Sequence, residues 1–386
     1  MPPSAAEGLY LGLISGTSAD SIDAVLVDFI RGTPQVQATH THPWPSMLRD
    51  HMLALAQGEA AVDLDAVGRL DVAIGHCFAD AALHLLEQSG TAADTVRAIG
   101  SHGQTLRHRP SGEHPFTLQL GDPTVIAERC GIDVVADFRR ADVAAGGQGA
   151  PLLPALHAML LARPGRTRVV LNLGGIANIT VLDADGSVRG FDTGPANGLL
   201  DAWCMRHRGE PFDRDGVFAA SGKVDLSLLD ALLADGYFAL APPKSTGREY
   251  FHLDWLTTHP QLAAVHPADV QATLLELTAR SVATAITQHA PTAEEVLACG
   301  GGTHNSVLMR RLGELLTPRA VYSTAQYGID PDFLEATAFA WLARQRLLGL
   351  PGNLPAVTGA RGPRVLGAIY QASAAVSSSR IFSGAH

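Results

Sequence analysis

Hydrophobic positions along the chain follow two kinds of pattern. Short apolar runs rich in β-branched residues predict buried strands. They lie at 9–14, 22–29, 96–100, 116–120, 132–136, 168–172, 179–182 and 295–297. Longer stretches with an apolar residue every three or four positions predict helices at 63–88, 268–289 and 332–348. Strands interleaved with helices favour the α/β class.

A strand, a short polar turn and a second strand occur in this order twice. The first copy spans 9–29 and the second spans 168–182. Because the copies lie about one domain length apart, we expect two domains of similar plan, 1–140 and 141–366. The C-terminal segment, from about residue 367 to 386, is expected to pack back on the first domain.

Composition and charge restrict the partners of the protein. The 386 residues include 28 Lys and Arg against 38 Asp and Glu, for a net charge of -10. An acidic chain without a basic block is a poor binder of nucleic acids and anionic membranes. No apolar run approaches the ~20 residues of a membrane span, and the first residues lack a basic signal-peptide region. We therefore predict a cytoplasmic protein with neither a nucleic-acid nor a membrane partner.

The turn of the first hairpin carries residues suited to chemistry. It reads Gly16, Thr17, Ser18, Ala19, Asp20, Ser21, Ile22, Asp23. Glycine allows close backbone approach, and hydroxyl and N–H groups can surround phosphate oxygens. A carboxylate among them would repel phosphate unless a Mg²⁺ ion lay between, so the turn suits a magnesium nucleotide. The same residue types also occur in ordinary hairpin turns.

Two further glycine turns follow later in the chain. One contains Gly174 and Gly175, and the other contains Gly300, Gly301 and Gly302 directly after the strand at 295–297. Together with an isolated Asp192 in Phe-Asp-Thr-Gly-Pro, the three turns favour a nucleotide site over three unrelated turns. The P-loop, G-x-G-x-x-G, G-x-S-x-G and H-E-x-x-H patterns are absent. His40 and His42 have strand spacing and no third ligand nearby in sequence, which argues against a metal site.

The ordered set of motifs resembles the anhydro-N-acetylmuramic acid kinase family. The matching segments are 16–23, 101–105, 137–139, 146–151, 172–175, 191–195, 299–305 and 335–342. The resemblance runs from Leu9 to about Gly367, almost the whole chain. It implies the fold of the hexokinase, actin and Hsp70 superfamily, in which two duplicated ribonuclease-H-like (actin-like ATPase) domains flank a nucleotide cleft. It also implies a homodimer.

The activity implied by the resemblance is a phosphoryl transfer coupled to ring opening. Water attacks C1 of 1,6-anhydro-N-acetylmuramic acid while O6 takes the γ-phosphoryl group of ATP, giving N-acetylmuramic acid 6-phosphate and ADP. Such a reaction requires a base for the water, and Asp192 holds that position in the matching motif. The cofactors implied are ATP and Mg²⁺.

Further roles follow by motif position. The resemblance implies that ATP is contacted by residues Gly16 to Asp23, with Asp20 near the Mg²⁺. It implies further ATP contacts by Gly174, Gly175, Gly300, Gly301, Gly302 and Asn305. The amino sugar is assigned to His102, Gln104, Asp137, Arg139 and Glu335. An Arg fork suits the lactyl carboxylate of this sugar. Each of these loops could also be held only by internal hydrogen bonds.

The sequence departs from the family pattern at one position of the first turn, and two other functions are compatible with the motifs. The family usually has Gly where Ser21 stands, so a positive φ is expected at Ser21. A related kinase with another sugar or acid as substrate would share the ATP motifs and differ in the loops near 101–142 and 335. A nucleotide-gated switch that hydrolyses ATP without sugar would share the fold.

Overall fold

The computed structural model describes residues 7–16, 19–30, 33–57, 63–247 and 250–372. The chain divides into two compact units, and each is considered by itself. The first combines Met1–Gly149, Glu335–Asn353 and Arg361–His386, and the second combines Ala150–Leu334 and Leu354–Ala360. Thr17 and Ser18, two of the residues assigned to ATP, lie outside the described residues.

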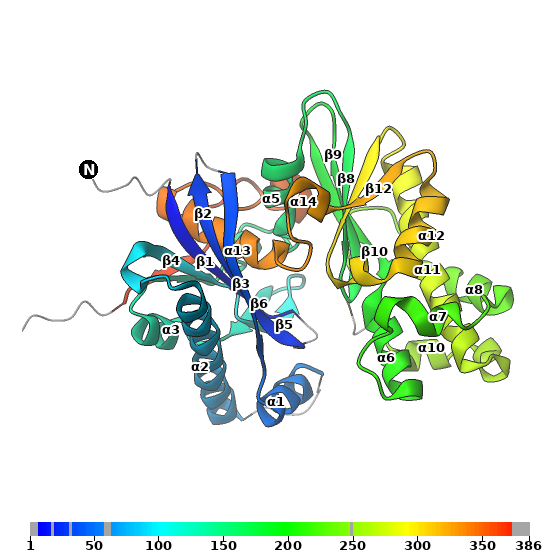
Figure 1. Ribbon diagram of the computed structural model, residues 1–386, viewed down its shortest axis with the longest axis horizontal. Helices are drawn as coiled ribbons and strands as arrows, with labels where there is room; N and C mark the ends of the chain where they lie inside the picture. The colour runs from blue at the N-terminus through cyan, green and yellow to red at the C-terminus, as the bar shows by residue number, and fades with distance from the viewer. Residues whose placement is uncertain (1–6, 17–18, 31–32, 58–62, 248–249, 373–386) are drawn as a thin grey trace, which may run out of the picture. The chain divides into compact units, whose positions relative to one another are not determined.

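The first unit is built on a six-stranded sheet (Figure 1). Its strands, in spatial order, are β13 (Ala368–Tyr370), β7 (Val134–Ala136), β4 (Val96–Ser101), β1 (Gly8–Ile14), β2 (Ser21–Ile30) and β3 (Thr33–Pro43). Strands β1, β2 and β3 form an antiparallel meander. Strand β4 runs parallel to β1, β7 runs parallel to β4, and β13 closes the edge antiparallel to β7.

The two faces of this sheet are covered by different helices. Alternate residues of β1, Leu11 and Leu13, pack in one core with α2 (Leu64–Ser89). On the other face lies α13 (Leu334–Leu348), where a Cβ added at Gly12 would be 1.9 Å from the Ala336 carbonyl oxygen. The helix therefore rests directly on the strands of the first unit. The division expected from the sequence assigned these residues to the second domain.

The second unit is built on a five-stranded sheet. Its strands, in spatial order, are β10 (Val188–Pro195), β9 (Ile176–Leu182), β8 (Arg168–Leu173), β11 (Glu295–Cys299) and β12 (Ala320–Ser323). Phe191 of β10 joins the core formed with α6 (Asn197–Arg208), α11 (Pro267–His289) and α12 (Ser306–Leu316). A Cβ at the neighbouring Gly190 would instead meet Pro154 and Val357, so α5 (Leu153–Leu161) and α14 (Pro355–Thr358) cover the other face.

Both sheets share one topology. Each has a three-stranded antiparallel meander, and further parallel strands are added beside the first strand of that meander. This is the strand order of a ribonuclease-H-like fold, and it confirms the predicted α/β class with two duplicated domains. The hairpins predicted at 9–29 and 168–182 are confirmed as β1–β2 and β8–β9.

The remaining elements connect these layers. Strands β5 (Gln104–Arg109) and β6 (Phe116–Leu120) form a separate antiparallel pair. The other helices are α1 (Ser46–Gln57), α3 (Pro123–Cys130), α4 (Arg140–Ala144), α7 (Val217–Ala220), α8 (Leu226–Leu233), α9 (Gly236–Ala239) and α10 (Leu253–Thr257). Short 3₁₀ helices occur at Ala93–Thr95, Arg214–Gly216, Pro260–Ala264, Gly301–His304 and Thr324–Tyr327.

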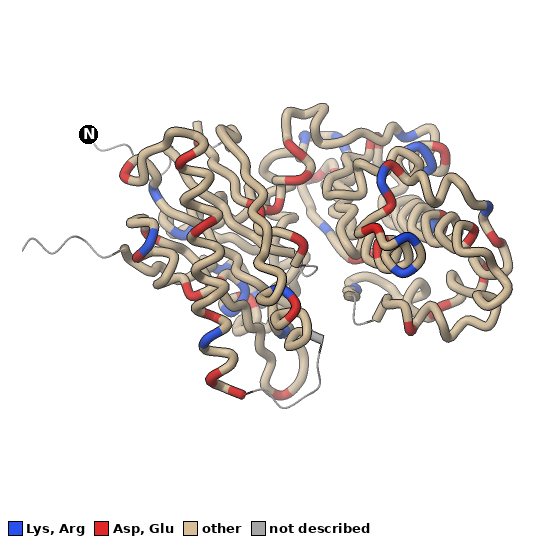
Figure 2. Tube along the Cα trace, turned by 60° about the horizontal axis from the view of Figure 1, so that its bottom comes forward, with Lys and Arg blue, Asp and Glu red and all other residues tan. Residues whose placement is uncertain are grey.

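Charged residues of both signs are interspersed along both units, as Figure 2 shows. Among the helices that the structure describes, none combines the length and the apolar character needed to cross a membrane.

Candidate functional site

A backbone hydrogen bond joins Gly16 and Ala19, the described residues on either side of the turn after β1 in the first unit. The Ala19 N–H donates to the Gly16 carbonyl at 3.0 Å, and Ala19 is fully buried with a φ of 49°. Gln104 Nε2 donates to the same Gly16 carbonyl at 3.1 Å, which joins a residue assigned to the sugar to a turn assigned to the phosphates. The expectation of a positive φ at Ser21 is wrong, because Ser21 begins β2 and pairs with Pro43 in extended conformation.

Arg49 of α1 supports this turn, and sequence patterns gave no sign of it. Its Nε donates to the Ala19 carbonyl at 2.7 Å, and its Nη2 lies 3.3 Å from Asp20 Oδ1. The Asp20 side chain remains 69% exposed. In the described residues no group of three or more His, Cys, Asp or Glu could hold a metal ion by itself. Mg²⁺ in kinases is held by phosphates and one or two carboxylates, so the exposed carboxylate of Asp20 fits such an ion.

His102 and Arg139 form a direct pair. Arg139 donates from Nε and Nη2 to His102 Nε2 at 3.0 and 2.9 Å. The other ring nitrogen, Nδ1, lies 2.8 Å from the Gly103 carbonyl, so His102 is a neutral ring with its proton on Nδ1. Burial, and then the Arg139 charge, hold the pKa of His102 well below its usual range. The ring therefore orients Arg139 and does not act as an acid near neutral pH.

Arg139 is also fixed from its other side. Its Nη1 donates to the Gly149 carbonyl at 2.8 Å. The buried Asp142 carboxylate anchors that loop by accepting from the Gly149 N–H at 2.8 Å and from Asn353 Nδ2 at 2.6 Å. Burial lowers the pKa of Arg139 to about 10, against the charges of Glu335 and Asp142. Sequence patterns did not reveal Asp142 or Asn353 as supports.

Three of the five residues assigned to the sugar are linked in the first unit. His102 and Arg139 are in contact, and Glu335, in the first turn of α13, acts on Arg139 through its charge. Gln104 bonds instead to the Gly16 carbonyl, and Asp137 has a φ of 62° and pairs with Arg140 at 3.5 Å.

The other two glycine turns lie side by side in the second unit. Gly300 has a φ of 82°, and a Cβ there would lie 2.5 Å from Asn172 Oδ1 and 2.9 Å from the Leu173 carbonyl. A Cβ at Gly302 would lie 2.6 Å from that of Leu173. Asn305 caps α12, accepting from the Leu308 N–H at 3.0 Å. Two bare backbone turns next to a helix N-terminus fit a flat base or a phosphate group.

Asp192 lies in β10, where the strand register shifts. Its Oδ2 accepts from the Thr246 N–H at 2.9 Å, and its carbonyl accepts from the Tyr237 hydroxyl at 2.8 Å. Its N–H donates to the Lys244 carbonyl at 3.1 Å. The segment from 237 to 246 therefore holds Asp192 at three points, and no sequence motif had indicated this segment.

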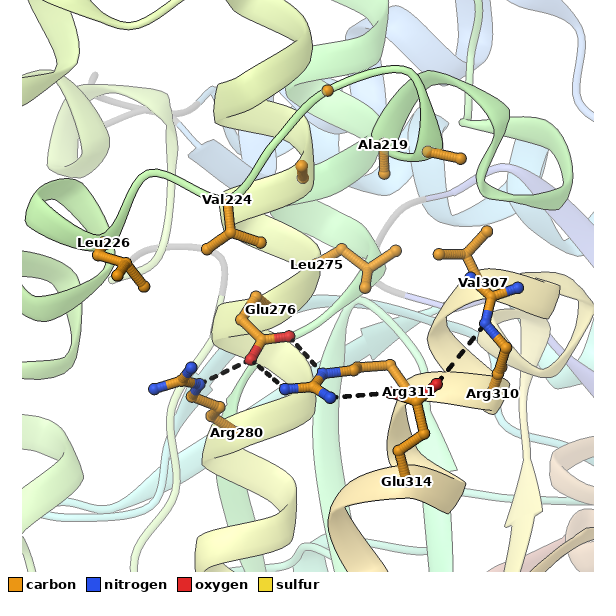
Figure 3. A pocket seen from close by; sticks show the side chains of 13 residues that line it. Ala219, Val224, Leu226, Leu275, Glu276, Arg280, Val307, Arg310, Arg311 and Glu314 are labelled. Carbon is orange, nitrogen blue, oxygen red and sulfur yellow. Dashed lines mark hydrogen bonds and ion pairs between the residues drawn. The ribbon is translucent and has the colours of Figure 1, made fainter.

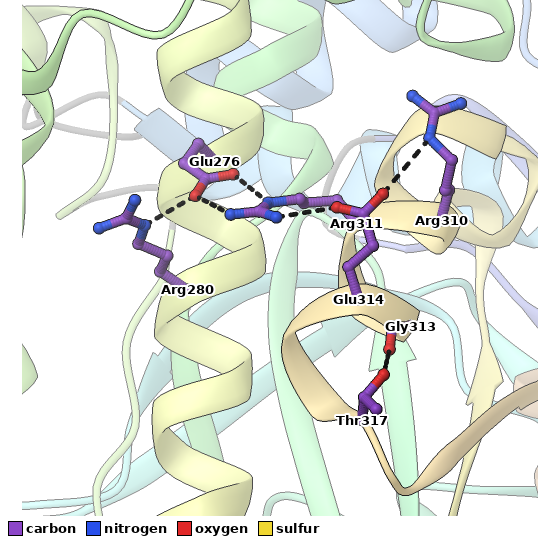
Figure 4. Close-up of polar contacts among 7 residues, drawn as sticks. All are labelled: Glu276, Arg280, Arg310, Arg311, Gly313, Glu314 and Thr317. Carbon is purple, nitrogen blue, oxygen red and sulfur yellow. Dashed lines mark hydrogen bonds and ion pairs between the residues drawn. The ribbon is translucent and has the colours of Figure 1, made fainter.

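A cavity of about 410 Å³ in the second unit is separate from the predicted residues. It lies between α7, α11 and α12, and none of the residues assigned to ATP or sugar lines it (Figure 3). Its wall includes a buried Glu276 bonded to Arg280 and Arg311 (Figure 4).

The pair His40 and His42 has a third neighbour in space. The ring of His84 from α2 lies 5.8 Å from that of His40 and 5.2 Å from that of His42. The sequence had suggested no third histidine nearby, because His84 is distant along the chain. This cluster is still not among groups able to hold a metal in the described part of the chain.

The fold and these sites define a class: a two-domain ribonuclease-H-like protein with glycine turns in both units. Comparison with known proteins narrows it. Residues 8–372 match the family described as Anhydro-N-acetylmuramic acid kinase. Proteins of that name from Xanthomonas campestris pv. campestris (strain 8004) and Xanthomonas axonopodis pv. citri are 58% and 59% identical over 94% of this chain, covering 97% and 98% of their own length. One from Coxiella burnetii (strain Dugway 5J108-111) is 51% identical over 94% of this chain and 97% of its own.

The chain belongs to the anhydro-N-acetylmuramic acid kinase family.

Proposed function

We propose that the protein uses ATP to phosphorylate 1,6-anhydro-N-acetylmuramic acid at O6 and opens the 1,6-anhydro ring with water. The products are N-acetylmuramic acid 6-phosphate and ADP, which places the enzyme in peptidoglycan recycling and amino-sugar catabolism. Family membership over nearly the whole chain is the observation that carries this proposal. The reaction belongs in the cytoplasm, where ATP is available.

Asp192 is the proposed base. It takes a proton from the water whose oxygen attacks C1, the C1–O6 bond breaks, and O6 accepts the γ-phosphoryl group. Support comes from the way the carboxylate is held: Oδ2 is oriented by the Thr246 N–H and the backbone is fixed by Tyr237. A base fixed in this way needs no reorganisation when the proton moves.

The proposed ATP contacts are the glycine turns of the two units. The turn from Gly16 to Asp23 would surround the phosphates, and Gly174, Gly175, Gly300, Gly301, Gly302 and Asn305 would line the nucleotide. Support comes from Gly301, where an added Cβ would meet only Asn197 Nδ2 at 3.8 Å, so the backbone there is open to a ligand. Mg²⁺ near Asp20 would neutralise charge on the transferring phosphoryl group.

The proposed sugar contacts are in the first unit. Arg139 would bind the lactyl carboxylate, because its guanidinium is oriented by His102 and Gly149 before any ligand arrives. Gln104 and Glu335 would bind hydroxyl or amide groups, and Asp137 is a further candidate. The buried Gln104 Oε1 has no hydrogen-bond partner among the described residues, which supports a contact with a ligand donor. A homodimer is proposed from the resemblance and is tested by sedimentation.

The decisive measurement is ADP release from Mg-ATP with and without the anhydro sugar. Wild type is expected to release ADP only with the sugar, and Asp192→Asn is expected to lose on the order of 10²–10⁴-fold in kcat. Full activity of Asp192→Asn would remove the base assignment. ADP release without sugar would favour an ATP-driven switch, and turnover only with another sugar would favour a related kinase.

A further inference from the structure

A network in the second unit surrounds Asp192, and none of its members belongs to the motifs of the sequence. Tyr237 lies at its centre. Its side chain is 5% exposed, its hydroxyl donates to the Asp192 carbonyl, and its N–H donates to Asp235 Oδ1 at 2.8 Å. Asp235 Oδ2 accepts from Trp255 Nε1 at 2.9 Å. The backbone of Tyr237 is thus itself held by Asp235, which is in turn held by Trp255.

Lys244 is held against this ring. Its Nζ lies 4.6 Å from the centre of the Tyr237 ring and donates to the Tyr237 carbonyl at 3.1 Å. Burial lowers the pKa of Lys244, and the charge of Asp192 acts in the opposite direction. The charge of the Asp192 carboxylate therefore acts on the Lys244 ammonium.

The backbone around Lys244 ties the two residues together. The Lys244 carbonyl accepts from the Asp192 N–H, and two residues later the Thr246 N–H donates to Asp192 Oδ2. A shift of this segment would move the ammonium and the carboxylate's hydrogen-bond donor at the same time. The basic residues of the chain are almost all Arg, with Lys only at 223 and 244.

We propose that Lys244 is a positioning residue for Asp192, keeping its carboxylate ionised and oriented for proton transfer from water. A cation near a carboxylate favours the ionised form, which is the form that can act as a base. Tyr237 fixes the ammonium through its ring and carbonyl, and it fixes Asp192 through its hydroxyl. The inference rests on the proposed function, in which Asp192 is the base.

The test compares Lys244→Met with Lys223→Met. The second variant is the same substitution at the only other lysine, which is exposed in the same unit. The sugar-dependent kcat and both KM values are measured from about pH 5 to pH 9. Lys244→Met is expected to lose about tenfold in kcat at pH 7 with little change in KM for ATP. The fall of kcat on the acidic side of the pH profile (the acid limb) is expected to move to higher pH, because Asp192 is protonated more easily without the cation. Lys223→Met should match wild type.

Two further variants separate positioning from folding. Lys244→Arg keeps the charge and is expected to restore the acid limb. Tyr237→Phe removes only the hydroxyl and should lower kcat, whereas Tyr250→Phe, which removes a hydroxyl bonded to Asp235, should not. A pH profile of Lys244→Met whose acid limb matches that of wild type overturns the inference. A wild type without sugar-dependent ADP release overturns the proposed function itself, whatever the variants do.

Discussion

At the scale of single residues, Arg139 shows how a binding group is prepared before its ligand arrives. Both hydrogen bonds to His102 come from one edge of the guanidinium, and Nη1 is bonded to Gly149. Holding a long side chain in one rotamer removes part of the entropy cost of binding. The neighbouring Arg140 is 60% exposed and pairs with Asp137.

The difference between the two arginines can be measured. Arg139→Lys is expected to raise KM for the sugar by about tenfold or more, because a single ammonium cannot reproduce the planar fork. Arg140→Lys is the matched control and should leave KM within about twofold of wild type. A larger effect at Arg140 would move the sugar contact to that residue, and equal effects would contradict the assignment to Arg139.

At the scale of secondary-structure elements, α11 and α12 are joined by one buried carboxylate. Glu276 of α11 is 5% exposed and accepts from Arg311 Nε and Nη2 of α12 at 2.8 and 2.9 Å, and from Arg280 Nε at 2.7 Å (Figure 4). Burial by itself raises the pKa of Glu276, but the hydrogen bonds from Arg311 and Arg280 outweigh it, so the pKa is lowered.

Glu276→Gln is expected to lower the free energy of unfolding by about 1–3 kcal/mol near pH 7, since Arg280 and Arg311, which are 39% and 32% exposed, lose the charge of a buried hydrogen-bond partner. Because the pKa of Glu276 is lower in the folded than in the unfolded protein, its stabilising contribution is fully present above the unfolded-state pKa of about 4.3. This contribution is lost as the pH falls through the folded-state pKa. The difference in the free energy of unfolding between wild type and Glu276→Gln should therefore stay constant from about pH 5 to 8 and decrease below pH 5.

Urea unfolding at several pH values checks this, with Glu314→Gln as control. Glu314 is also bonded to Arg311 but is 53% exposed, so its loss should cost less than about 1 kcal/mol. A difference that is equal for both variants, or that does not shrink in acid, would contradict the role given to Glu276.

At the scale of the whole molecule, the first unit is assembled from distant parts of the chain. Helix α13 comes after the long segment Ala150–Leu334 of the second unit in sequence, yet it packs on β1 and β4 through Gly12 and Gly100. A Cβ at Gly100 would lie 2.0 Å from the Phe339 carbonyl oxygen. The same helix places Phe339 against the His102 ring at 4.7 Å and begins with Glu335 beside Arg139. Its docking therefore completes the proposed sugar site.

Gly12→Ala is expected to destabilise the protein by about 1–3 kcal/mol or more, because α13 must move away from the strand. Its KM for the sugar should rise together with the loss of stability, since Glu335 and Phe339 move with the helix. Gly68→Ala is the control: Gly68 is exposed in α2 with no atom near its added Cβ, so it should gain about 0.5–1 kcal/mol. Thermal unfolding and sugar kinetics of both variants provide the measurement. Similar stability of the two would contradict the close packing.

Local sequence patterns determined much of this protein. Alternating and helical apolar spacing predicted both hairpins and the long helices, because burial of one face imposes that spacing on neighbouring residues. Glycine turns and the Asp192 motif were visible as well, since close backbone approach requires particular residue types at consecutive positions.

The tertiary structure alone decided which side chains meet. Arg49 beside Asp20, Arg139 on His102, His84 beside His42, and Lys244 near Asp192 all join residues far apart in the chain. Apolar spacing indicates which face of an element is buried, but not which other element covers it. The orientation of Arg139 and Asp192 depends on those distant partners, so it follows from the packing of the folded chain and from no local pattern.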